Sequence, residues 1–222
     1  MHLRRLAIGA AALLAGLALP GCAKNYSSDF PLAVGFSMLE PCQASAPSAT
    51  ATDPYPETLG PRMSGESNGH LWAHGRAYIH VPVAFVYQAL HDPYASYIHG
   101  PDTQVFPGDE PFPISYAVQY TVHSLITVQW TIQYRGGVTS GTEAAPEGIG
   151  MRYHDVWPNN YVKLQDGSME AAPVDGAPDV TEVSFVCWLD AHGQGQDDVW
   201  GTVTDWFNDL TARAHACAAG SC

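Results

Sequence analysis

The stretch "GRAYIHVPVAFVYQALHDP", residues 75–93, changes its periodicity in the middle, and this change decides the fold. Residues 71–81 alternate between the two faces of a β-strand. Pro82 suits the first turn of a helix, where its missing N–H needs no partner, and apolar residues then recur at helical spacing over 83–90. Asp92-Pro93 ends this helix. The sequence therefore predicts a strand that leads directly into a short helix.

Two clean strands are predicted further along the chain. A second short helix over 94–100 comes first, followed by a loop over 101–113, whose prolines exclude regular structure. Residues 115–123 and 127–135 then alternate as half-buried antiparallel strands do, with one apolar and one wetted face. Their apolar faces consist of Tyr116, Val118, Tyr120 and Val122 in the first strand and of Val128, Trp130, Ile132 and Tyr134 in the second.

The glycine-rich residues 136–150 are predicted to form a loop between strands. A phosphate-binding loop would end in Gly-Lys-Ser/Thr and lead into a helix, and this segment does neither. Further strands are predicted over 151–157, 160–165 and 179–193. One face of the last strand carries Val183, Phe185, Cys187 and Leu189.

The chain ends in a long amphipathic helix over 197–216, with an apolar stripe through Val199, Val203, Trp206 and Leu210. A sheet with one apolar face needs a cover, and this helix is long and apolar enough to provide it. The sequence therefore predicts an α+β fold: a curved antiparallel sheet of about six to seven strands that grips the terminal helix. The two short helices after the first strand let the sheet curl around it.

This element order resembles the START-like superfamily (SRPBCC, helix-grip fold), and the resemblance covers residues 70–217. The pattern is one of packing residues without an invariant catalytic group, so it implies a fold more strongly than an activity. It implies an apolar cavity between sheet and helix for sterols, fatty acids, polyketides or other hydrophobic ligands. The residues that carry it are Gly75, Ala77, Ile79, Pro82, Val86, Leu90, Asp92 and Pro93, with Val199, Trp206 and Leu210 in the last helix.

In such a fold the wall of the core is also the wall of the cavity. Arg152 or His154 would bind a carboxylate or keto oxygen of a ligand if its strand turned it inward, and would form solvated pairs on the outer face otherwise. The expected cavity residues are Tyr116, Val118, Tyr120, Trp130, Ile132, Tyr134, Arg152, Phe185, Cys187, Val203, Trp206 and Leu210.

Catalytic and metal-binding patterns are weak in this sequence. No acid–base pair or nucleophile motif stands at a recognisable spacing, and His74 and His80 lie too far apart on one strand to share a metal ion. We therefore expect no cofactor and favour binding of a hydrophobic small molecule over catalysis. A cyclase- or hydrolase-like enzyme that uses the same cavity, and a structural envelope protein with a filled cavity, remain the alternatives.

The N-terminus resembles a bacterial lipoprotein signal. Arg4 and Arg5 precede an apolar run, and Leu19-Pro20-Gly21-Cys22 resembles the lipobox, in which the cysteine becomes the lipid-modified N-terminus. We expect a signal peptide over 1–21, lipidation at Cys22, a Pro/Ala/Ser/Thr-rich tether over 22–69, the folded domain over 70–217 and a tail over 218–222. Such a protein is held in the cell envelope by its acyl chains. By resemblance to the enterobacterial sorting rule, Ala23 after the cysteine favours the outer membrane over the inner.

Charge and cysteines narrow the class of protein further. Nine Lys and Arg face 22 Asp and Glu, without a basic cluster, which excludes a nucleic-acid-binding surface. In an oxidising compartment the four cysteines after Cys22 allow three pairings. Cys187 is expected to be a buried free thiol, the spacing of Cys217 and Cys222 permits a small disulfide loop, and Cys42 competes for either.

Overall fold

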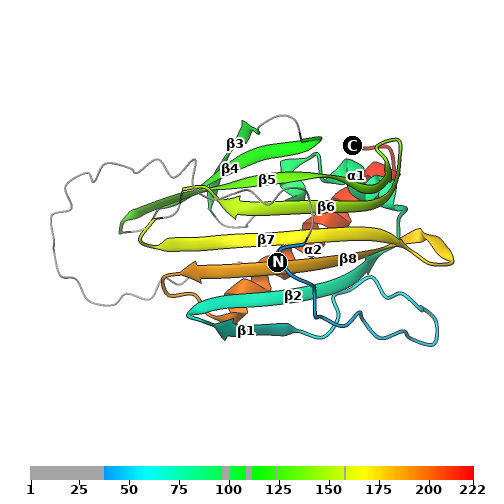
Figure 1. The fold of residues 1–222 in the computed structure, drawn as a ribbon, viewed down its shortest axis with the longest axis horizontal. Helices are drawn as coiled ribbons and strands as arrows, with labels where there is room; N and C mark the ends of the chain where they lie inside the picture. The colour runs from blue at the N-terminus through cyan, green and yellow to red at the C-terminus, as the bar shows by residue number, and fades with distance from the viewer. Residues whose placement is uncertain (1–37, 97–100, 109–111, 124, 158) are drawn as a thin grey trace.

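The computed structural model describes residues 38–222 except 97–100, 109–111, 124 and 158. These residues form one open antiparallel sheet of eight strands, in the order β1-β2-β8-β7-β6-β5-β4-β3. The long helix α2, Gln196–Ala218, lies across one face of the sheet (Figure 1). The predicted α+β fold is confirmed, with eight strands in place of the expected six to seven.

The strands and the short helices follow one another along the chain with few long connections. The strands are β1 Met63–Ser67, β2 His70–Ile79, β3 Asp102–Pro107, β4 Ile114–His123, β5 Thr127–Thr142, β6 Ala145–Asp155, β7 Val162–Val174 and β8 Ala177–Ala191; the short helices are α1 Val83–Ala89 and the 3₁₀-helix η1 Pro93–Ser96.

The stretch 75–93 forms the end of β2, helix α1 and the start of η1, as its two periodicities predicted. Pro82 is the N-cap of α1, and the carbonyl of Val81 before it accepts a hydrogen bond of 2.7 Å from the buried Thr181 hydroxyl. The two helices carry the chain from β2 to β3, the edge strand on the far side of the sheet. The predicted second helix is shorter than expected, since η1 ends at Ser96 and residues 97–100 lie outside the described residues.

Helix α2 lies close to β2 because β2 has a glycine at the contact. A Cβ atom on Gly75 would lie 2.6 Å from Val203 Cγ1 and 3.1 Å from Leu59 Cδ2. Both distances are shorter than carbon atoms tolerate without moving, so only glycine fits at this position. The apolar stripe of α2 is buried along its length: Val199, Val203, Trp206, Phe207, Leu210 and Ala214.

The space between the middle of the sheet and α2 is filled by aromatic rings. Tyr116 stacks on Tyr134 with ring centroids 5.0 Å apart, and Tyr134 lies 5.6 Å from Tyr153. Trp206 of α2 packs against Tyr153 and Phe185, with both centroid distances at 5.1 Å. Trp206 is therefore packed core, with 3% of its surface exposed.

The prediction of an irregular loop over 101–113 is wrong for its first half, which forms β3. The strand pairs with β4 from Asp102, opposite Thr121, to Pro107, opposite Tyr116. Proline is tolerated there because β3 is an edge strand, where one side of the backbone needs no partner.

The prediction of a glycine-rich loop over 136–150 is also wrong. Strand β5 continues to Thr142 and β6 begins at Ala145, so this segment is a long hairpin with a tight turn. At Gly136 the backbones of β5 and β6 lie very close together, because a Cβ there would lie 2.9 Å from the carbonyl oxygen of Gly150. Irregular pairing between Val138 and Gly141 marks a β-bulge, which bends the hairpin.

Strand β1 lies upstream of the predicted start of the domain at residue 70. Asn68 and Gly69, both with positive φ (53° and 80°), form the two-residue turn that joins β1 to β2. Asn-Gly is the preferred sequence of such hairpin turns, because both residues tolerate the left-handed region. The sheet thus begins within the segment that was expected to be a tether.

Residues 38–44, called the strap below, cross the face of the sheet opposite α2 (Figure 1). The Leu39 N–H donates to the Ser168 hydroxyl oxygen at 2.8 Å, and the Met38 N–H donates to the Glu170 carboxylate at 3.2 Å. Ala44, at the other end of the strap, is buried. The strap therefore covers part of the outer face of β7, β8 and β2.

We predict that Gly75→Ala lowers the free energy of unfolding by about 1–3 kcal/mol, because the added methyl group forces Val203 and α2 away from β2. Gly201→Ala in α2 is the matched control, since a Cβ there meets no atom within 4 Å. It should leave stability unchanged or raise it by up to about 1 kcal/mol through helix propensity. Urea denaturation of both variants measures the difference, and a Gly75→Ala protein as stable as wild type would contradict the close contact.

Candidate ligand site

An apolar pocket of about 130 Å³ lies at one end of the sheet. The turn between β4 and β5, the start of β7, the end of β8 and the first turns of α2 form its walls. Its lining residues are Pro101, Val122, Ile126, Val128, Trp130, Tyr161, Val162, Gln165, Leu189, Ala191, His192, Gln194 and Thr202.

The inner wall of the pocket is built on Trp130. Its ring stacks on Tyr120 with centroids 5.3 Å apart and planes 22° from parallel, which fixes the indole against the sheet. The indole N–H donates to Gln165 Oε1 at 3.0 Å. Gln165 is only 4% exposed, so it places a buried amide in a wall that is otherwise apolar.

The mouth of the pocket is also rich in apolar side chains. Ile126 and Tyr161 line it and are 44% and 42% exposed, and Leu125 beside Ile126 is 91% exposed. The Tyr161 ring meets His192 edge-on at 6.2 Å. A ligand that enters here therefore passes apolar surface before it reaches Trp130.

Of the cavity residues predicted from the sequence, Trp130 lines this pocket. The others on the inner face form the packed core described above: Tyr116, Val118, Tyr120, Ile132, Tyr134, Phe185, Cys187, Val203, Trp206 and Leu210. The rest of the lining, including Gln165 and Leu189, was not among the predicted cavity residues. A glutamine on the inward face of a strand was a signal for the first, because a polar side chain there needs a partner.

Arg152 lies on the opposite face of β6 from Tyr153, which packs under α2. It is half-buried next to Asp166; burial lowers the pKa of its guanidinium, and the Asp166 charge opposes this shift. His154 on the same face contacts Asp166, with Nδ1 2.5 Å from Oδ1. Arg152 and His154 therefore lie on the outer face of the sheet, where they interact with Asp166, and Arg152 does not belong to the ligand cavity.

The core phenols and the core thiol stay neutral. Burial raises the pKa values of Tyr134 and Tyr153 well above the usual value for tyrosine. Burial also raises the pKa of Cys187 to about 12. These groups are poor acid–base catalysts at neutral pH, because their raised pKa values keep them protonated there.

Asp155, the last residue of β6, differs from these groups in that its pKa lies near neutral pH. It is 3% exposed, and burial raises the pKa of its carboxyl group from 3.8 to about 7, although the Trp157 N–H and the charge of His154 oppose the shift. Its Oδ1 accepts the Trp157 N–H at 2.9 Å, while Oδ2 has no hydrogen-bond partner among the described residues. Asp155 therefore changes its charge near neutral pH.

A second cluster of chemically active groups joins the strap to the sheet. The buried His74 has Nε2 2.8 Å from Glu40 Oε1, and its Nδ1 accepts the Gln43 N–H at 3.0 Å. The Trp188 indole N–H donates to the same Glu40 oxygen at 3.0 Å. Cys42 Sγ lies 3.4 Å from the carbonyl oxygen of Gly75.

The Cys42 thiol is more acidic than an ordinary cysteine. Burial acts to raise its pKa, but the contacts with the His74 ring and the Ala44 backbone and the nearby Arg76 guanidinium lower the pKa overall. Cys187 is buried in the core on the inner face of β8, two residues from Phe185.

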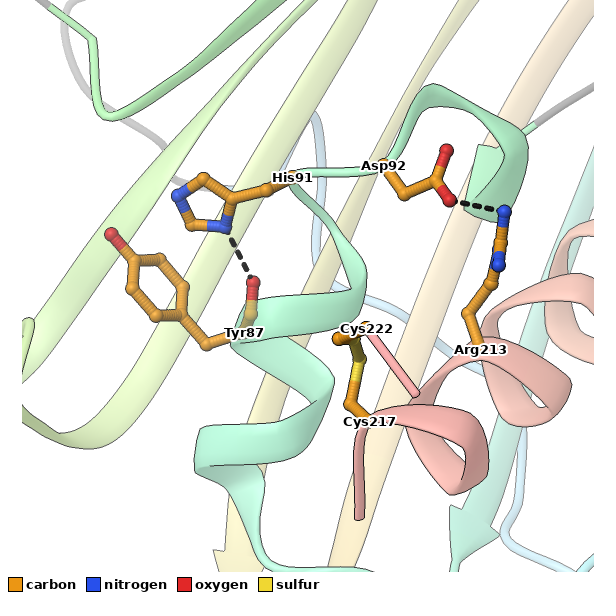
Figure 2. The surroundings of a disulfide bond; sticks show 6 residues. All are labelled: Tyr87, His91, Asp92, Arg213, Cys217 and Cys222. Atoms are coloured by element: carbon orange, nitrogen blue, oxygen red, sulfur yellow. Dashed lines mark hydrogen bonds and ion pairs between the residues drawn. A yellow bond between two sulfur atoms is a disulfide. The ribbon is translucent and has the colours of Figure 1, made fainter. Parts of the chain in front are cut away.

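Cys217 and Cys222 form a disulfide at the end of α2 (Figure 2). Close to it, Arg213 of α2 forms an ion pair with Asp92, just before η1. His91 Nδ1 lies 2.9 Å from the Tyr87 carbonyl oxygen, and because a carbonyl can only accept, the ring nitrogen is the donor. Cys42 and Cys187 are free.

No group of three His, Cys, Asp or Glu side chains in the described part of the chain is placed to hold a metal ion. His70 pairs with Asp190 at 3.7 Å, and the His80 ring contacts the Tyr55 carbonyl at 2.6 Å. Over the same residues, every helix is too short or too polar to cross a membrane. Cys22 and the predicted signal peptide lie outside the described residues.

We predict that the free energy of unfolding falls as the pH rises from about 4 to about 7, by up to about 4 kcal/mol from Asp155 alone. The native state binds the Asp155 proton more tightly than the unfolded chain, so this contribution is complete below pH 3.8 and lost above about 7. Asp155→Asn should remove this part of the pH dependence. Denaturation curves at several pH values test it, and an unchanged slope in Asp155→Asn would refute a buried neutral carboxyl.

We also predict that iodoacetamide modifies Cys42 of the folded, non-reduced protein much faster than Cys187. The thiolate is the reactive form, and the two pKa values are shifted in opposite directions. Peptide mass spectrometry after a timed quench measures both rates. In urea the two cysteines should react at similar rates, and equal rates in the folded protein would be inconsistent with the contacts of His74.

Comparison with known proteins gives likeness at the level of structure only. No family model matches the sequence, and no curated protein matches it. The solved Zhui aromatase/cyclase from Streptomyces sp. R1128 is 15% identical, with a TM-score of 0.46 over 69% of this chain and 99% of that chain. Human STARD10 is 10% identical, with a TM-score of 0.46 over 72% of this chain and 75% of that chain.

A third similar structure, TTHA0849 from Thermus thermophilus, is 14% identical, with a TM-score of 0.45 over 66% of this chain and 99% of that chain. At these identities the likeness assigns no ligand and no activity to this chain. The helix-grip fold is established by the chain's own sheet order and terminal helix.

Proposed function

We propose that the chain is a START-like domain that binds a small apolar molecule in the pocket at the open end of its sheet. The observation that carries the proposal is the pocket itself, whose walls are apolar except for one buried amide and a few groups at the mouth. Concave apolar sites with few polar groups are the usual form of small-molecule sites. The motif of residues 75–93 supports the same family.

The size of the pocket favours a ligand with one ring or a short branched chain. An apolar protein cavity of about 150 Å³ holds benzene, and the pocket here is about 130 Å³. A sterol or a long acyl chain would have to displace Tyr120 and Trp130, which stack on each other and lie in the core. Such a ligand fits only if most of it stays outside the mouth.

Binding is favoured over catalysis by the chemistry of the lining. Tyr161 and His192 are its ionisable side chains, and both lie at the mouth. A nucleophile with a neighbouring base, which acyl transfer needs, is absent from the described lining residues. A cyclase-like activity would have to rely on His192 alone.

We further propose that Cys22 anchors the protein in the cell envelope through acyl chains. The basic residues, the apolar run and the "LPGC" sequence occur in the order that this modification requires. A domain held in this way would meet apolar ligands that partition into lipid.

We predict that toluene binds to the wild-type protein saturably and that Ala191→Phe weakens this binding at least tenfold. Ala191 is half-buried in the pocket wall at the end of β8, and the larger ring fills the space. Ala172→Phe is the matched control, since Ala172 is exposed on β7 away from the pocket. Isothermal titration of the three proteins measures the affinities. Absence of toluene binding by the wild type, or equal binding by Ala191→Phe, would refute this pocket as a ligand site.

A further inference from the structure

We propose that the ligand of this pocket carries one uncharged hydrogen-bond acceptor, a carbonyl oxygen, which is bound by the side-chain amide nitrogen of Gln165. The inference rests on the proposed function and adds the chemical class of the ligand. It distinguishes aromatic or branched ketones, aldehydes and esters from hydrocarbons of the same shape.

The orientation of the Gln165 amide is fixed by its neighbour. An indole N–H can only donate a hydrogen bond, so the group that faces Trp130 Nε1 at 3.0 Å must be the amide oxygen, Oε1. The amide nitrogen therefore points away from Trp130. Trp130 is itself held by its stack on Tyr120, so the amide cannot easily reverse.

The amide nitrogen of Gln165 is left without a protein acceptor. It donates no hydrogen bond to any described residue, although the side chain is 96% removed from solvent and lines the pocket. Gln165 Nε2 keeps some accessible surface although it has no protein partner, and an acceptor on the ligand would form a hydrogen bond with it. The donor thus faces the space in which the ligand would lie.

The other polar groups of the lining are engaged elsewhere or exposed. The Thr202 hydroxyl donates to the Asp198 carbonyl at 3.2 Å, within α2. The Gln194 amide nitrogen lies 3.1 Å from the Asp198 carboxylate in the orientation that satisfies both groups. His192 and Tyr161 lie at the mouth. Gln165 is therefore the deepest group of the lining that can select a ligand by a hydrogen bond.

The acceptor is expected to be uncharged. The chain has a formal charge of −13, and the amide supplies no positive charge to balance a buried carboxylate. Lysine and arginine are absent from the described lining residues, so a carboxylate in the pocket would find no cation to pair with. A carboxylate ligand would be repelled, whereas a ketone or ester would not.

The test compares acetophenone with α-methylstyrene, in which a CH₂ group replaces the carbonyl oxygen and the shape is kept. Isothermal titration of wild type should give about threefold to tenfold tighter binding of acetophenone, as expected for one net hydrogen bond. Gln165→Leu should bind the two compounds equally. Gln129→Leu is the matched control, since Gln129 is exposed on β5 and its amide donates to Thr121; it should keep the preference.

Gln165→Leu leaves the Trp130 N–H unpaired, so its fold is checked by circular dichroism. Gln165→Glu is the second variant, measured at pH 9 so that its carboxyl group is ionised; it keeps an acceptor for Trp130, has no donor, and should also lose the preference for acetophenone. Equal binding of both compounds by wild type, with toluene still bound, would overturn the inference and leave the pocket as a ligand site. A preference that persists in both Gln165 variants would overturn it as well. Failure of wild type to bind toluene or either compound would overturn the proposed function and this inference together.

Discussion

The contact between Val203 of α2 and Gly75 of β2 is the constraint on which the rest of the structure depends. A side chain at position 75 would meet Val203 and Leu59 at distances that carbon atoms do not tolerate, so glycine sets how closely helix and sheet approach. This approach brings Trp206, one helical turn further, against Tyr153 and Phe185. Because helix and sheet are in contact there, aromatic rings of the described residues pack against one another in the middle of the molecule.

The pocket lies where this close packing ends. Towards its N-terminus α2 presents Thr202 instead of a large ring, and the β4–β5 turn together with the ends of β7 and β8 closes the remaining sides. Trp130 marks the border, since one side of its ring stacks on Tyr120 in the core while its edge contacts Gln165 in the pocket wall. The site is thus a part of the core that the aromatic side chains do not fill.

Elements with a strong hydrophobic periodicity could be predicted from the sequence. Elements whose existence depends on their place in the complete sheet could not. Alternation in 115–123 and 127–135 and the stripe of the last helix correspond to β4, β5 and α2. Strand β3 was missed because Pro107 argues against a strand unless the strand is known to be an edge, which depends on the complete sheet order. The sequence feature that points to β1 is Asn68-Gly69, a dipeptide typical of two-residue hairpin turns.

The site was less predictable than the fold. Alternation correctly placed Trp130 on the inner face, but it could not show which inner residues touch each other and which border an empty space. That distinction depends on ring geometry, such as the stack of Tyr116 on Tyr134. The strap has a different kind of consequence. A force that pulls the chain from its N-terminal side would act first on the hydrogen bonds between the strap and the sheet. These bonds join Leu39 to Ser168, Glu40 to Trp188 and Gln43 to His74. The strap would therefore bear the force before any strand of the sheet does.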